Sequence, residues 1–115
     1  HRKAIFQIYK KTLSQSKNIK VLDSKDKNLS NSHWLCTIYS NNRLVLQKKL
    51  RKYNIETNQV HFRNDRYKIF SKFTKNKKFP NMDLVENKYL VLPLNLKISK
   101  NDANYIANTI LSLVG

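Results

Sequence analysis

The chain has 115 residues, 40% of them hydrophobic, and its 23 basic and 7 acidic side chains give a formal net charge of +16. This length fits one modest domain, and the apolar content is high enough to offset the entropy lost when such a chain folds. The only glycine is the last residue, which excludes the glycine-rich phosphate loops of P-loop and dinucleotide-binding proteins.

The first third of the chain predicts one helix and two strands. Apolar residues recur at helical spacing over 4–13, and a short apolar run over 19–22 is typical of a strand. A polar loop leads to a stronger strand over 33–39. In that strand Trp34 alternates with its neighbours, so we expect it to share one face with Cys36 and Ile38.

The middle of the chain predicts a second helix and a third strand. Asn41 or Asn42 can cap the helix, and Leu46, Leu50 and Tyr53 form its apolar stripe. The segment 55–62 then has the composition of a strand.

The last part of the chain predicts short helices, a strand and a long final helix. Helical stretches are expected near 67–73 and 82–88, followed by an apolar strand over 89–94. Ser99 and Asp102 have the spacing of a capping box at the start of the last helix. This order of elements indicates an α+β fold, with a small, mainly antiparallel sheet covered by helices.

The charge of +16 makes nucleic acid a partner to consider, because clustered basic residues release counterions from phosphates. The lysines, however, are spread along the chain, and only 72–78 approaches a cluster. We therefore expect no specific nucleic-acid binding, and a stand-alone basic nucleic-acid-binding module remains the alternative function.

Several other features limit the chemistry. The single Cys36 cannot form an internal disulfide, and His33 and Cys36 would lie on opposite faces of a strand, so we expect no metal site. No apolar run approaches the roughly 20 residues that cross a bilayer. We expect a cytoplasmic protein without a membrane partner. The chain begins with His1 and not with an initiator methionine, and a helical pattern is already present at this point. We therefore expect a further segment before His1.

Polar side chains are dense at the end of the predicted third strand, over 59–66. His61 can act as a base, Asn64 both donates and accepts hydrogen bonds, and Arg63 suits a carboxylate or phosphate. Side chains of these three kinds together are suited to recognise a polar, anionic ligand. A polar turn, with solvated arginines, explains the same residues equally well.

Four landmarks occur in one order: HWLCTIY, NIETNQVHFRND, YLVLPL and the final helix from Ile98 to Ile106. In this order they resemble the C-terminal region of the DegT/DnrJ/EryC1/StrS aminotransferases, pyridoxal-phosphate enzymes that aminate keto groups on nucleotide-linked sugars. Asn54 stands where that family usually has glycine, and Tyr67 where one branch often has histidine.

The resemblance implies that residues 1–115 are the small C-terminal domain of a fold-type I aminotransferase. The pyridoxal phosphate and its Schiff-base lysine would then belong to a large domain upstream, and this chain would hold no catalytic residue. Glutamate as amino donor, a homodimer, and a place in amino-sugar and polysaccharide biosynthesis are implied as well. His61 and Asn64 would contact substrate hydroxyls or the keto oxygen, Arg63 a carboxylate or phosphate, and Trp34 would stack or support them.

Overall fold

A computed structural model describes residues 1–115 and contains one three-stranded antiparallel sheet. Strands β1 (Ile19–Val21), β2 (Cys36–Ser40) and β3 (Tyr89–Leu92) lie in the order β1-β2-β3. Both pairings are antiparallel, with Ile38 opposite Val21 on one side and Leu90 on the other. The predicted α+β class with a small antiparallel sheet is confirmed.

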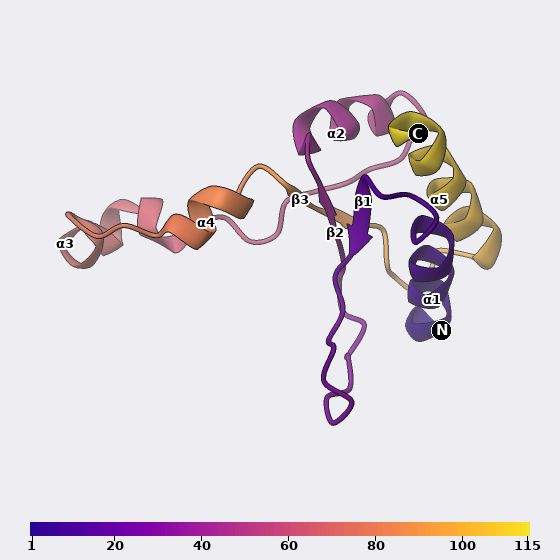
Figure 1. Cartoon of the computed structure of the whole chain (residues 1–115), viewed down its shortest axis with the longest axis horizontal. Helices are drawn as coiled ribbons and strands as arrows, with labels where there is room; N and C mark the ends of the chain where they lie inside the picture. The colour runs from indigo at the N-terminus through magenta and orange to yellow at the C-terminus, as the bar shows by residue number, and fades with distance from the viewer.

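Two long helices build the core with this sheet. Helix α1 (Arg2–Leu13) and helix α5 (Lys100–Val114) lie side by side against it (Figure 1). Most of their predicted apolar stripes are buried, although Ala4 is exposed and Ile8 and Leu111 are half-buried. The largest side chains of this core are Ile5, Phe6, Tyr9, Leu13, Ile38, Leu50, Leu90, Leu92 and Ile110.

Both predicted helix caps are confirmed. The Asn42 side chain accepts a hydrogen bond from the Val45 amide at the start of α2 (Arg43–Arg51). At the start of α5, Ser99 and Asp102 exchange side-chain and backbone hydrogen bonds in a complete capping box. Tyr53 was predicted on the apolar stripe of α2, but that helix ends at Arg51 and Tyr53 is exposed.

The strand predicted over 33–39 begins only at Cys36, so the prediction for Trp34 is wrong. His33 has a left-handed backbone (φ 52°), and its amide donates to Asn31 Oδ1 over 2.7 Å. This turn ends the alternation, because extended backbone is needed to place successive side chains on opposite faces. Trp34 consequently lies outside the core, with 61% of its surface exposed.

The prediction of a strand over 55–62 is also wrong, since only one bridge pairs this segment with the sheet. Asn58 exchanges two backbone hydrogen bonds with Val91 of the neighbouring strand β3. Ile55 and Thr57 are buried in the alternation expected of a strand, but the chain then leaves the sheet. The departing backbone is fixed from the side by Tyr89, whose hydroxyl donates to the His61 carbonyl over 2.7 Å.

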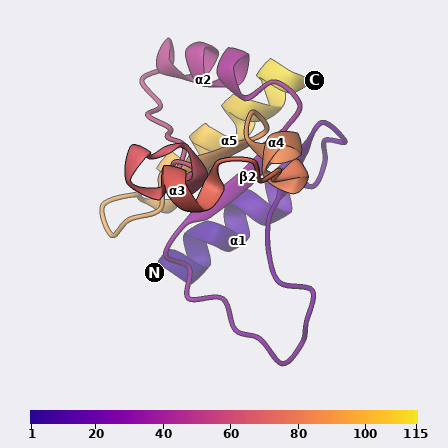
Figure 2. The same cartoon turned by 90° about the vertical axis from the view of Figure 1, so that its left-hand side faces the viewer.

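Residues 61–87, here called the arm, project away from the core (Figure 1). The arm contains two 3-10 helices, η1 (Asn64–Arg66) and η2 (Lys68–Phe70), and the short helices α3 (Ser71–Thr74) and α4 (Pro80–Val85). Figure 2 shows the arm end-on, in front of the sheet. The short helices expected near 67–73 and 82–88 are therefore present, the second beginning two residues early at Pro80. None of the helices is long and apolar enough to cross a membrane.

Candidate functional site

Residues 61–65, from the polar segment noted over 59–66, line a hollow in the arm. The hollow has a volume of about 990 Å³ and opens between the 61–65 segment, α3 and α4. Residues 61–65 form one wall, and apolar side chains such as Phe73, Phe79 and Met82 form much of the rest. An apolar cleft with a few polar groups at its edge is the usual form of a small-molecule site.

Trp34 and His61 are 27 positions apart in sequence, yet the structure brings their rings together. The ring centroids are 6.0 Å apart, with an interplanar angle of 43°. Trp34 precedes β2, and His61 follows the bridge between Asn58 and β3. Both rings are largely exposed. The two predicted site residues therefore form one aromatic edge next to the hollow.

The side chains of His61 and Asn64 are free to bind a ligand. Both residues are exposed and line the hollow, and neither side chain makes a hydrogen bond within the chain. Their backbones are held, because the His61 carbonyl accepts from Tyr89 and the Asn64 carbonyl accepts from Tyr67. A fixed backbone with free polar side chains is well suited to recognise hydroxyl or carbonyl groups.

Arg63 has a different environment from the one expected of a ligand-binding arginine. Only 5% of its surface is exposed, and its guanidinium is surrounded by three carboxylates. Nε and Nη2 donate to the two oxygens of Asp65 over 2.9 and 2.7 Å. Nη1 donates to Asp83 and, over 3.1 Å, to Glu86. The three carboxylates already accept hydrogen bonds from Nε, Nη1 and Nη2 of Arg63. Contact between Arg63 and a substrate anion stays a prediction.

The ion cluster around Arg63 joins the first part of the arm to α4. Hydrogen bonds from Arg63 lower the pKa of the Asp65 carboxyl, and hydrogen bonds to Asp65 and Asp83 raise the pKa of Arg63. Arg66 adds a second link to Glu86 over 2.6 Å. Three of the 7 acidic residues of the chain meet at this point. The cluster thus holds the wall that carries His61 and Asn64.

Sequence reasoning missed the residues that support this wall. Tyr89 looked like an ordinary strand residue, and nothing local indicates that its hydroxyl reaches the His61 carbonyl. Asp83 and Glu86 are three positions apart on a predicted helix, which places them on one face. That spacing was the available signal for a shared cationic partner.

Cys36 is fully buried in the core, and burial raises the pKa of its thiol to about 12. At pH 8 only about one thiol in ten thousand is then the reactive thiolate. We expect no reaction with a thiol reagent such as Ellman's reagent in the native protein and full reaction in denaturant. A Ser30→Cys variant, with its new thiol in an exposed loop, should react at once, and a native Cys36 that reacts equally fast would contradict the prediction.

The lysines of this chain do not fit the attachment of pyridoxal phosphate. All are exposed or half-buried, and none lines the hollow beside His61. A lysine that forms a Schiff base normally sits in a site that lowers its pKa by desolvation or by a neighbouring cation. No step of cofactor chemistry is therefore assigned to residues 1–115.

The model of the DegT/DnrJ/EryC1/StrS aminotransferase family matches residues 1–111. The chain belongs to this family. The match covers α1, the sheet, the whole arm and α5 as far as Leu111. Comparison with curated proteins gives no significant match.

Solved structures share the fold of this family member at low sequence identity. The sugar aminotransferase CalS13 from Micromonospora echinospora superposes with a TM-score of 0.86 and 18% identity, over 96% of this chain and 29% of its own. PseC from Helicobacter pylori, an aminotransferase of pseudoaminic acid biosynthesis, has a TM-score of 0.81 and 17% identity, over 98% and 32%. The chain thus spans about 30% of the length of the structures that it matches.

Proposed function

We propose that residues 1–115 are the small C-terminal domain of an aminotransferase that transfers an amino group from glutamate to a keto group of a nucleotide-linked sugar. Membership of the family supports amino transfer. The sugar is proposed because CalS13 is a sugar aminotransferase with the same fold. The observation that carries the proposal is the edge of the hollow, where Trp34, His61 and Asn64 present one aromatic ring and two free polar side chains.

Pyridoxal phosphate is proposed as the cofactor, held by a large domain that lies outside this chain. Spr1654 from Streptococcus pneumoniae, described as a sugar aminotransferase, has been solved in a PLP form and matches with a TM-score of 0.84 and 21% identity. This chain covers 30% of that structure, which leaves room for such a domain. A cytoplasmic homodimer is proposed with it, on the resemblance to the family.

Each residue of the edge has a proposed part in binding the sugar. His61 and Asn64 donate to or accept from its hydroxyl groups or keto oxygen, and Trp34 supports His61 or stacks on the sugar ring. For Arg63 we propose that it positions these residues through its ion cluster, and the direct contact with a substrate carboxylate or phosphate is the alternative role.

His61→Ala and Asn64→Ala each remove hydrogen bonds to the sugar, so KM for the nucleotide-linked sugar should rise by about tenfold in the enzyme that carries this chain. KM for glutamate should change little if these residues face the sugar. Steady-state kinetics with both substrates varied measures this. Asn101→Ala is the matched control, because Asn101 is exposed on α5 and its side chain makes no hydrogen bond. Unchanged KM in both site variants would remove the assignment.

A further inference from the structure

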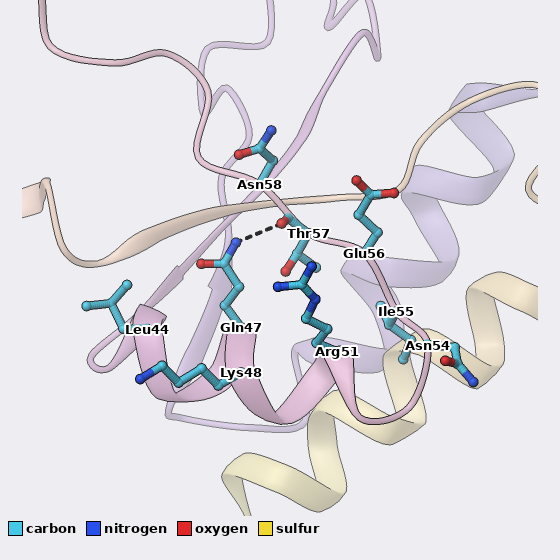
Figure 3. A pocket seen from close by; sticks show the side chains of 9 residues that line it. All are labelled: Leu44, Gln47, Lys48, Arg51, Asn54, Ile55, Glu56, Thr57 and Asn58. Atoms are coloured by element: carbon cyan, nitrogen blue, oxygen red, sulfur yellow. Dashed lines mark hydrogen bonds between the residues drawn. The ribbon is translucent and has the colours of Figure 1, made fainter.

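A second hollow, separate from the arm, lies between α2 and the segment that follows it. It has a volume of about 760 Å³ and shares no lining residue with the hollow beside His61. Figure 3 shows the side chains of Gln47, Arg51 and Thr57 converging at its centre. The proposed function uses none of these residues.

The hydroxyl of Thr57 has no partner although it is enclosed. Thr57 is 8% exposed, and its Oγ1 is buried without any hydrogen bond. Buried polar groups are nearly always hydrogen-bonded, so an unpaired hydroxyl beside a hollow indicates a missing partner. The backbone beside it is fixed, because Gln47 Nε2 donates to the Thr57 carbonyl over 2.8 Å.

Three side chains around this hydroxyl can donate hydrogen bonds. The Arg51 guanidinium makes no ion pair or hydrogen bond within the chain, and the Gln47 amide has a second N–H beyond the one that it uses. Lys48 lines the hollow at its edge. The unpaired guanidinium is the charged donor at this centre, and oxygen anions are the ligand groups that it binds best.

The charges at the hollow point the same way. Two cations, Lys48 and Arg51, and one carboxylate, Glu56, line it. In Figure 3 the Glu56 carboxylate points away from the converging donors. The donors therefore face the ligand position with net positive charge, which favours an anion.

We propose that this hollow binds an oxyanion, a phosphate ester or a carboxylate, through Arg51, the Thr57 hydroxyl and the free N–H of Gln47. The site is independent of the proposed sugar-binding edge, since no residue belongs to both. Arg51 supplies a fork of two donors that matches either anion, and Thr57 supplies the buried donor.

Calorimetric titration of the protein with inorganic phosphate and, separately, with succinate tests this assignment at constant ionic strength. One of the two probes should bind at a single site, and the identity of that probe distinguishes phosphate from carboxylate. Arg51→Gln should weaken this binding by about tenfold and Thr57→Val by several-fold, since each removes a hydrogen bond to a charged group. Glu56→Gln should strengthen it, because a like charge is lost.

Lys52→Gln is the matched control, since Lys52 is the C-cap residue directly after α2, is exposed and does not line the hollow. It should leave the affinity unchanged. Thr57→Val keeps the side-chain shape and removes only an unpaired hydroxyl, so its melting temperature should stay close to that of the parent protein. Three results would overturn the site: no binding of either probe, equal weakening by Lys52→Gln and Arg51→Gln, or binding that Arg51→Gln leaves intact.

Discussion

Replacing Arg63 with methionine is expected to release the arm from its fixed position. The substitution removes four hydrogen bonds and leaves Asp65, Asp83 and Glu86 close together, with Arg66 as the one remaining partner, of Glu86. Repulsion among these carboxylates adds to the loss. Amide hydrogen exchange should become about tenfold faster or more in η2, α3 and α4, while the core amides of α1 and α5 keep their protection.

Arg66→Met is the control for this change. Arg66 makes one ion pair, to Glu86, and its side chain is 51% exposed, so the arm should keep most of its protection. Equal exchange in the two variants would contradict a central role for Arg63. Kinetics of Arg63→Met separate its two proposed roles. If Arg63 positions the site, KM rises together with faster hydrogen exchange in the arm. If Arg63 contacts a substrate anion directly, KM rises while the arm stays protected.

The same cluster predicts a local response to acid. The pKa of Asp65 is lowered from its ordinary value of 3.8, so the folded arm favours the ionised carboxyl. Its stabilising contribution is complete above 3.8 and is lost as the pH falls through the lowered pKa of the folded state. Protection factors of the arm should therefore fall as the pH drops from 3.8 toward the lowered pKa of the folded state. This fall should be absent in Arg63→Met.

Leu90→Ala is expected to give a large loss of global stability. Leu90 is fully buried in β3 and lies opposite Ile38 of β2. Truncation of such a leucine costs about 2–5 kcal/mol through lost burial and the remaining cavity. A small domain has about 5–15 kcal/mol in total, so the variant should unfold at much lower urea concentration.

Leu96→Ala makes the matched comparison, because 74% of Leu96 is exposed. Its free energy of unfolding should stay within about 0.5 kcal/mol of the parent protein. Similar losses from the two leucines would show that β3 does not lie at the centre of the core.

The elements that the sequence predicted well are those whose signal is local. The stripe of α5 and its capping box need only residues three or four positions apart, and both are confirmed. The apolar run of β3 is short and bounded by polar residues, so its place was also predictable. These elements carry the core and determine the small antiparallel sheet.

The errors concern one local turn and several residues whose environment depends on distant partners. Trp34 leaves the strand pattern because of the left-handed turn at His33, a conformation that few residues other than Gly, Asn, Asp and His adopt. The 55–62 segment alternates like a strand but follows the arm after one bridge. Arg63 is 20 positions from Asp83, and no local pattern announces that pairing. The close approach of Trp34 and His61 likewise needed the fold.

We propose that this chain belongs to an enzyme that aminates a nucleotide-linked keto sugar and that the edge formed by Trp34, His61 and Asn64 binds that sugar. Transfer of ¹⁵N from labelled glutamate to the sugar, followed by mass spectrometry, tests it most directly in the purified protein that carries residues 1–115. We expect a labelled amino sugar, and slower labelling by a His61→Ala, Asn64→Ala variant at subsaturating sugar. A folded, pyridoxal-phosphate-loaded protein that labels no keto sugar, or a variant that labels it as fast as the parent, would contradict this proposal.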